Sequence, residues 1–578
     1  MKKLTAWALI MAMAFTHIPA AAAAVTEETV TEEAAAAAEE VTEEAGAAAG
    51  KISVCISSEP ETLDPTLADG TDTIIYALHQ FEGLMKYVPT GEPAADGESG
   101  VSLLTVDYGQ AESCEVSEDG LTYTFQLRDG IRWSDGREVT AADFEYAWKR
   151  MVDPKTAAGY GYLLDGVVEN ASEIQAEELD PDELGIRAVD EKTLEITLAG
   201  RCPYFLDLCC FPALYPVRED VIDACGSAWT DPENLVCNGP YVLSSWVHDS
   251  YLEMTANEYY YDPAGGPEVI TWYLNADQTS RLAAYQTGEY DFIIDIPTDQ
   301  IEPLRESGGC FVADQVGTYY LFVNCDVITD WRVRAAICLA IDRDNIVQHV
   351  TQGGEEPAYG LISAGITTWD GANWTDICGE ILYAALQERY PDYDLTEYDG
   401  RCELAEVLLE EAEADGYDLS AAIDYEFNTS DTHKAVAEAV QADLASVLGL
   451  HVVLSNQEWN VYTSSLAEGG FGLARLGWTA DYDDPITYIE LFTEGNSNNY
   501  GNYASDTYTR LVSEAKSMED GQERDELMEE AESMLFDENG FAVCPIYFYK
   551  QTFCIADGME RVGWTPLGYF VFSYAEAE

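Results

Sequence analysis

The chain has 578 residues, of which 107 are Asp or Glu and 28 are Lys or Arg, so its formal net charge is −79. It is roughly three to four times as long as a typical domain, so we expect more than one lobe. Hydrophobic residues make up 47%, which allows large cores and excludes a mainly disordered chain. So acidic a surface repels phosphate groups, which argues against nucleic acid and anionic membrane surfaces as partners. A salty habitat, cationic ligands and colloidal solubility all remain open as reasons for the acidity.

The N-terminus has the pattern of a targeting segment. Lysines follow Met1, an apolar run extends from Leu4 to Phe15, and small residues occupy Ala20–Ala24. This pattern predicts a secretory signal peptide over residues 1–24, because the run is shorter than the roughly 20 residues of a membrane anchor. The first cysteine is Cys55, so we expect an exported protein without a lipid anchor.

Residues 25–50 contain mainly Ala, Thr, Val and Glu, which predicts an acidic, low-complexity tether. Fourteen cysteines follow, from Cys55 to Cys554, with no paired CxxC array. Export permits disulfides, but a chain this long does not depend on them, so we expect most cysteines to be buried thiols. The sequence does not determine any pairing.

The chain mixes strand and helix patterns throughout. Alternating apolar and polar residues predict strands at three places: 123–127, 194–198 and 270–274. Thr140 is a predicted helix N-cap, with Phe144, Trp148 and Met151 on the buried face of the helix that follows. We therefore expect an α/β protein.

Two later segments carry helical periodicity. One starts near Ser430 and stops at Gly449, with apolar residues at Val436, Val440, Leu444 and Leu448. The other precedes Gly540, with apolar residues at Leu527, Ala531, Met534 and Leu535. No fixed-period repeat is visible.

Signatures of catalysis are missing from the sequence. The six histidines show no zinc-ligand spacing, and neither a GxSxG nor a GxGxxG motif occurs. The cluster Asp481, Asp483 and Asp484 lacks the spacing of a calcium loop. We expect no enzyme, no metal and no cofactor. The 36 Tyr and 12 Trp suit binding of an organic solute, or simply large cores.

Several motifs together resemble family 5 of the extracytoplasmic solute-binding proteins. They are SEPETLDP from Ser58, the stretch Thr124–Arg150, NGPY from Asn238 and WRVRAAICLAIDRDNIV from Trp331. Three further segments are similar to oligopeptide-binding proteins: Asn428–Lys434, Asn456–Trp459 and Ala474–Pro485. The resemblance runs in order from about residue 51 to the end of the chain.

The resemblance implies a two-lobed clamp of the type II periplasmic-binding-protein class, with a hinge and an extra domain. By position, lobe I would comprise 51–81, 219–316 and 549–578, the extra domain 82–218 and lobe II 317–548. The implied function is a monomeric receptor that captures oligopeptides in an interdomain cleft. The receptor would deliver them to the permease subunits of an ABC importer.

The resemblance also implies roles for single residues. Asp481 matches the carboxylate that binds the peptide α-ammonium, and Arg475 and His433 match positions that receive the peptide carboxylate. Six further residues match positions that contact ligand or line its pockets: Trp478, Trp459, Tyr160, Tyr319, Tyr320 and Asp69. Each has a structural alternative, namely a turn cap for Asp481, an ion pair for Arg475, a local hydrogen bond for His433 and core packing for the aromatics.

The chain departs from the resembled family at two places. Thr351 stands where relatives can carry a lysine for very short peptides, which puts dipeptide binding in doubt. Gly317 and Thr479 stand where relatives have a cysteine pair, so that disulfide is absent. Alternatives are a receptor of the same fold for nickel chelates, haem or oligosaccharides, an exported peptidase or glycosidase, and an adhesin or chaperone-like protein.

Overall fold

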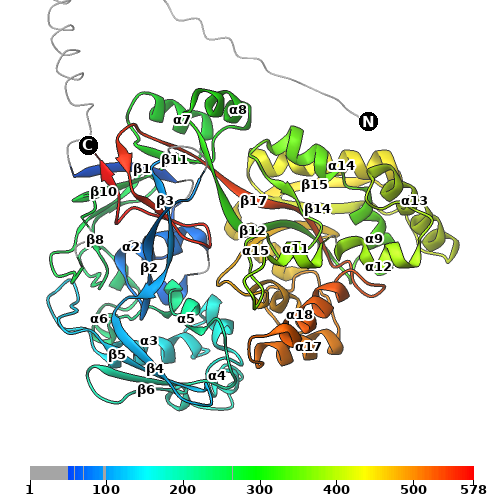
Figure 1. The fold of residues 1–578 in the computed structure, drawn as a ribbon. Helices are drawn as coiled ribbons and strands as arrows, with labels where there is room; N and C mark the ends of the chain where they lie inside the picture. Colours follow the sequence, from blue (N-terminus) through cyan, green and yellow to red (C-terminus); the bar gives the residue numbers. More distant parts are fainter. Residues whose placement is uncertain are drawn as a thin grey trace, which may run out of the picture. The chain divides into compact units, whose positions relative to one another are not determined.

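The computed structural model describes residues 50–56, 59–68, 70–95, 99–262, 265–379 and 381–577 (Figure 1). The predicted signal peptide, and the predicted tether except for Gly50, lie outside the described residues. So does Asp69, one of the predicted ligand-contacting residues.

An eleven-stranded mixed sheet organises the described chain. Its strands in spatial order are β15 (Val452–Gln457), β14 (Ile423–Asn428), β16 (Leu473–Thr479), β12 (Phe311–Val323), β17 (Val543–Ile555), β11 (Phe292–Ile294), β1 (Lys51–Ile56), β10 (Val269–Leu274), β9 (Tyr251–Ala256) and β8 (Tyr241–Val247), with β13 (Glu356–Pro357) also paired to β17. β14 runs parallel to β15 and β16, and β1 runs parallel to β10 and β11. Parallel pairing in two parts of the sheet, together with helices between the strands, confirms the α/β class.

The antiparallel strands β12 and β17 form the middle of this sheet and are its longest members, at 13 residues each. β16 flanks β12 on one side, and β11 flanks β17 on the other. In Figure 1 the two strands therefore run from the elements around β1 and β11 to those around β14 and β15. Their register shifts between Asp314 and Thr318 and again between Tyr319 and Tyr320, so the ladder is irregular near its centre.

Three smaller sheets complete the strands of the described residues. Their members are β2 (Met85–Pro93), β3 (Val101–Tyr108), β19 (Val562–Trp564) and β20 (Phe570–Val571); β4 (Ala111–Val116), β5 (Thr122–Leu127), β7 (Thr193–Thr197) and β6 (Ile186–Ala188); and β18 (Met559–Glu560) with β21 (Glu576–Ala577). The predicted strands at 123–127, 194–198 and 270–274 are confirmed as β5, β7 and β10, although β7 ends one residue before Leu198.

Helices cover the sheets. The α-helices are α2 (Thr71–Gln80), α3 (Ala141–Val152), α4 (Ala171–Gln175), α5 (Phe205–Leu208), α6 (Glu219–Cys225), α7 (Gln278–Gln286), α8 (Thr298–Ser307), α9 (Trp331–Ala340), α10 (Arg343–Asn345), α11 (Trp374–Cys378), α12 (Ile381–Arg389), α13 (Tyr398–Ala414), α14 (Asp431–Leu448), α15 (Trp459–Glu468), α16 (Ile486–Ile489), α17 (Asp506–Lys516) and α18 (Gln522–Met534). The shorter helical turns are η1 (Pro65–Leu67), η2 (Gly159–Leu164), η3 (Pro181–Glu183), η4 (Pro212–Leu214), η5 (Gly226–Thr230), η6 (Ile346–Thr351) and η7 (Glu490–Phe492).

The structure confirms most of the helix predictions. Thr140 and Asp143 form a reciprocal capping box at the start of α3, and the predicted inward residues of that helix are buried. The side chain of Ser430 caps α14, and Gly449 ends it with a φ of 65°, a conformation that glycine adopts without strain. In α18 the predicted buried face is only partly correct, because Met528 is buried whereas Leu527 and Met534 are only partly buried.

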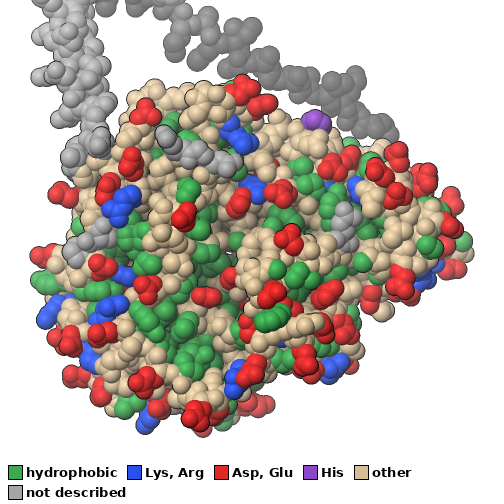
Figure 2. Space-filling model, viewed as in Figure 1, with side chains coloured by type: hydrophobic (Ala, Val, Ile, Leu, Met, Phe, Trp, Pro, Cys, Tyr) green, Lys and Arg blue, Asp and Glu red, His purple; other side chains and the backbone are tan. Residues whose placement is uncertain are grey.

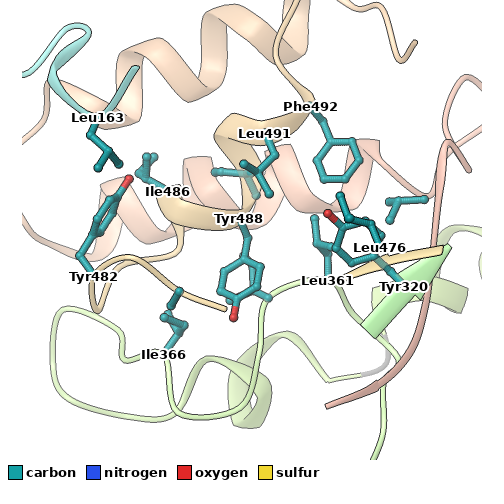
Figure 3. Close-up of a cluster of buried hydrophobic side chains, with 14 of the residues drawn as sticks. Leu163, Tyr320, Leu361, Ile366, Leu476, Tyr482, Ile486, Tyr488, Leu491 and Phe492 are labelled. Carbon is teal, nitrogen blue, oxygen red and sulfur yellow. The ribbon is translucent and has the colours of Figure 1, made fainter. Parts of the chain in front are cut away.

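The core is largely apolar and aromatic. Figure 3 shows one part of it, with Tyr482 at one side, Tyr488 in the middle, and Tyr320, Leu476 and Phe492 at the other side. All fourteen cysteines are thiols, and nine of them are buried, as the sequence predicted. Within the described residues, no helix has the length and apolar character needed to cross a bilayer. Acidic side chains are spread over the face drawn in Figure 2, and basic ones are sparser.

Candidate ligand-binding site

Three aspartates follow β16, and each has different partners. Asp484 is buried and accepts two hydrogen bonds from the guanidinium of Arg524, at 2.6 and 2.9 Å. Asp483 accepts from the backbone N–H and the hydroxyl of Thr367, at 2.8 and 3.0 Å. These two carboxylates therefore have strong structural partners.

Asp481 lacks a cationic partner. Its side chain is 2% exposed, and its Oδ2 accepts one hydrogen bond from the phenol of Tyr162, at 3.1 Å. In the part of the chain that the structure describes, no Lys, Arg or His forms an ion pair with it. A buried carboxylate without a cation is costly, so this position suits a ligand that brings a positive charge.

The electrostatics around Asp481 support this interpretation. Burial raises the pKa of the Asp481 carboxyl well above its ordinary 3.8, the nearby Glu490 carboxylate raises it further, and the hydrogen bond from Tyr162 opposes the rise. Glu490 itself forms an ion pair with Lys516 at 2.7 Å. An arriving ammonium group would favour the ionised form of Asp481 and gain a charge-assisted hydrogen bond.

Thr487, in α16, orients this part of the site. Its fully buried hydroxyl oxygen accepts the backbone N–H of Asp481 at 3.1 Å and the indole N–H of Trp478 at 3.3 Å. One hydroxyl thus holds both the backbone of Asp481 and the ring of Trp478, two residues that the sequence assigned to one ligand site.

Arg475, six residues before Asp481 in the chain, is the centre of a second group of polar side chains. Its guanidinium donates to Asn428 Oδ1 at 2.9 Å and to the hydroxyl of Tyr549 at 3.0 Å, and it lies 4.9 Å from the ring centroid of Tyr319. Its Nε–H is buried without a hydrogen-bond partner among the described residues. Arg475 is therefore a buried cation whose neighbours are neutral.

Two features allow this arrangement. Gly477 has no side chain, and a Cβ there would collide with the hydroxyl of Tyr549, so the glycine lets this tyrosine reach Arg475. His433 lies in the first turn of α14, with its ring 5.7 Å from that of Tyr319, and its Nδ1 is buried without a partner in the described structure. Burial lowers the pKa of His433 well below 6.5, and the charge of Arg475 lowers it further, so the imidazole is neutral near pH 7.

Comparison with known proteins identifies the family. The family described as bacterial extracellular solute-binding proteins, family 5 Middle, matches residues 105–500. The chain belongs to this family. It is 32% identical to the periplasmic oligopeptide-binding protein OppA of Salmonella typhimurium over 501 residues, covering 85% of this chain and 86% of that protein. It is 30% identical to the dipeptide-binding protein DppE of Bacillus subtilis over 524 residues, covering 90% of each.

Solved structures agree with this assignment. The crystal structure of Haemophilus influenzae OppA in complex with RPPGFSPFR has a TM-score of 0.79 and 27% identity, and the match covers 92% of this chain and 99% of that one. The two-lobed clamp fold predicted for this family 5 protein is therefore confirmed at the level of fold class.

The structure brings together most of the residues that the sequence predicted. Asp481 and Trp478 share Thr487, while Arg475, His433 and Tyr319 form the second group. The remaining predicted aromatics have other neighbours, and their ligand contacts stay predictions.

Tyr160 lies in η2 with its ring 4.8 Å from that of Phe211, and it is the nearby Tyr162 that donates to Asp481. Tyr320 packs against Phe322 and Phe492 in the core drawn in Figure 3. Trp459 begins α15 and is 43% exposed.

The structure shows what surrounds the residues at the two departures from the family pattern. Thr351 is buried and donates its hydroxyl to Glu355 at 2.8 Å, so an acidic side chain accompanies the missing lysine. Gly317 and Thr479 lie directly opposite each other on β12 and β16, which is where a cross-strand pair would fit.

Sequence reasoning missed four residues that hold the site together: Tyr162, Thr487, Asn428 and Tyr549. Asn428 is the first residue of the NTSDTHK motif, so the resemblance that singled out this motif could also have identified it. The contact of Tyr162 with Asp481 spans 319 residues, and no local pattern announces such a pair.

Proposed function

We propose that this family 5 protein is an extracytoplasmic receptor that binds oligopeptides by their two charged ends and delivers them to an ABC importer. The observation that carries the proposal is Asp481, a buried carboxylate whose only described side-chain partner is the neutral phenol of Tyr162. The peptide α-ammonium would supply the missing cation.

Arg475 supports the other half of the proposal. Its guanidinium is buried among neutral groups, and a peptide carboxylate would supply the missing anion. The neutral imidazole of His433 adds one hydrogen bond rather than a charge. Six residues separate Arg475 from Asp481, which is at most about 20 Å along an extended chain at about 3.3 Å per residue. That span suits a ligand of a few residues.

We further infer that the protein binds without turnover and requires no cofactor. The family is described as solute-binding proteins, and the relative from Salmonella typhimurium is named as an oligopeptide-binding protein. Within the described residues, no group of three or more His, Cys, Asp or Glu could hold a metal ion.

The proposal includes the expected organisation of the chain. Residues 51–81, 219–316 and 549–578 would move as lobe I, 82–218 as the extra domain and 317–548 as lobe II. The protein would be exported by its N-terminal signal and act as a monomer beside its permease subunits.

Mass spectrometry of the material released when the purified protein is denatured tests the function. We expect peptides with free amino and carboxyl ends. Release of a nickel chelate, haem or oligosaccharide would instead favour the alternative receptor of the same fold. A mixed peptide library should raise the melting temperature without any change in peptide masses, and time-dependent cleavage would refute binding without turnover.

A further inference from the structure

Two pairs of buried cysteines lie at the two ends of strand β17. Cys544 is the second residue of this strand and Cys554 is the second from its end. Each has a second cysteine beside it from another element: Cys338 in α9 and Cys310 immediately before β12. All four are buried thiols.

Strand register brings Cys310 and Cys554 together. Phe311 is opposite Phe553 in the antiparallel pair of β12 and β17, so one step further Cys310 faces Cys554 on the same side of the sheet. Directly opposed antiparallel residues have Cα atoms about 4.5–5.5 Å apart, within the roughly 4.4–6.8 Å that a disulfide spans. The two thiols form a hydrogen bond and share one apolar cluster.

Helix packing brings Cys338 and Cys544 together. The Sγ of Cys338 lies 4.0 Å from the carbonyl oxygen of Val543, the residue before Cys544. Arg343 connects the two, donating to the carbonyl of Cys338 at 3.0 Å and to the Sγ of Cys544 at 3.3 Å. These two thiols also form a hydrogen bond with each other.

In each pair, one thiol lies near an arginine. The hydrogen bond with Cys554 lowers the pKa of Cys310 below its ordinary 9.0; burial opposes this shift, and the charge of Arg305 adds to it. Burial would raise the pKa of Cys544, but the hydrogen bond with Cys338 and the Arg343 guanidinium bring it below 9.0. Each pair thus combines one thiol that ionises more readily with a thiol partner in contact, which is the arrangement that thiol–disulfide exchange needs.

Cys237 provides a contrast. It is equally buried, but its Sγ donates to the backbone carbonyl of Tyr241 at 3.2 Å, and no thiol in the described residues hydrogen-bonds to it. Burial alone therefore does not distinguish the four paired cysteines from Cys237. The contact of each with a second thiol does.

We propose that Cys310–Cys554 and Cys338–Cys544 form disulfides when the chain folds in the presence of a disulfide oxidant such as oxidised glutathione. One protein thiolate attacks a sulfur of the oxidant, forming a mixed disulfide and releasing one reduced thiol. The second protein thiolate then attacks the mixed disulfide and releases the other. Two protein thiols lose two electrons and two protons, and one oxidant disulfide becomes two thiols.

The position of the cross-links indicates their effect. The first would join β12 to β17 at the end near β11, and the second would join α9 to β17 at the other end. The irregular stretch of β12 from Asp314 to Thr318 lies between them and contains neither cysteine pair. The first cross-link would hold one end of the β12–β17 ribbon, the second would fasten α9 to the other end of β17, and neither would span the irregular centre.

Thiol trapping after refolding tests the proposal. The reduced, denatured full chain is refolded in a glutathione redox buffer, denatured again in iodoacetamide, and digested for peptide mapping. We expect four of the fourteen cysteines to be protected, leaving 14 − 4 = 10 alkylated, with linked peptides containing Cys310–Cys554 and Cys338–Cys544. Fourteen alkylated cysteines, or linkage to other cysteines, would overturn the proposal.

Variants separate the two bonds. Cys310→Ser should remove only the first linked peptide, Cys338→Ser only the second, and Cys237→Ser neither. Reductant should lower the melting temperature of the oxidised natural chain by several degrees, but should not change that of the Cys310→Ser, Cys338→Ser double variant. If this variant does not fold, peptide mapping of the natural chain still decides; an equal melting temperature with and without reductant in a chain that carries both bonds would contradict their role in holding the ribbon.

Discussion

The surroundings of Asp481 and those of Arg475 differ in charge, and this difference determines how the proposed site would hold the two ends of a peptide. Burial raises the pKa of the Asp481 carboxyl, the nearby Glu490 carboxylate raises it further, and a cation beside it would favour its ionised form. Arg475 is a permanent cation among tyrosines and an asparagine, which accept two of its hydrogen bonds without neutralising its charge. In the proposed complex the first site would change its protonation state on binding, and the second would not.

This difference assigns unequal roles to the two ends. Exchanging a buried carboxylate for an amide removes the whole countercharge of a ligand ammonium, whereas loss of Arg475 leaves the Asn428 and Tyr549 side chains able to hydrogen-bond a carboxylate. We therefore expect the amino end of the peptide to dominate affinity.

The largest effect should come from Asp481→Asn. The variant should bind a free peptide at least roughly 100-fold more weakly, about 3 kcal/mol, because the ligand ammonium loses its buried countercharge. Titration calorimetry measures the change. Asp483→Asn, which alters a carboxylate held by Thr367, is the matched control and should change affinity only a few-fold. Equal losses in both variants would show that the effect is not specific to Asp481.

Arg475→Gln should have a smaller effect that depends on the ligand. Loss of a charged hydrogen bond costs about 2 kcal/mol, so affinity for a peptide with a free carboxylate should fall about 30-fold. The natural protein should already bind the carboxyl-amidated peptide more weakly, and the variant should distinguish the two peptides much less. An undiminished preference for the free carboxylate would place that group elsewhere.

The stability of the empty protein should depend on pH through Asp481. The folded state holds this proton more tightly than the unfolded chain, whose Asp pKa is near 3.8, so the contribution of Asp481 to stability is full below that value. It is lost as the pH rises towards the raised folded pKa. Asp481→Asn has no carboxyl to ionise and does not lose stability in this way. Its melting temperature should therefore exceed that of the natural protein by roughly a few degrees near neutral pH, and this excess should shrink in acid. A constant difference across pH would contradict the raised pKa.

The smallest effect concerns association rate. The net charge of −79 should attract peptides with Lys or Arg side chains, giving them a several-fold higher rate at low salt than Glu-containing peptides. The difference should fade as the Debye length shrinks to about 8 Å at physiological ionic strength. Stopped-flow tryptophan fluorescence at two salt concentrations measures it. Equal rates at low salt would show that the acidity serves solubility alone.

Local sequence signals predicted elements well where one face of the element is buried. The capping box of α3 and the alternation of β5 are examples, since each depends on residues a few positions apart. The site was predicted in outline only because a resemblance supplied Asp481 and Arg475. The sequence did not predict Tyr162 and Thr487, which position Asp481. A tyrosine or threonine has no distinctive sequence spacing, and only tertiary packing brings these two residues to Asp481. The arginine partner of Asp484 lies 40 residues away and escaped for the same reason.

The most direct test of the central claim compares one peptide with a free amino end and its N-acetylated form on the natural protein and on Asp481→Asn. If Asp481 holds the α-ammonium, calorimetry should show that acetylation weakens binding to the natural protein roughly 100-fold or more, and that the variant barely distinguishes the two forms. Equal affinity of the natural protein for both peptides would contradict the account, because the buried carboxylate would then have a different ligand.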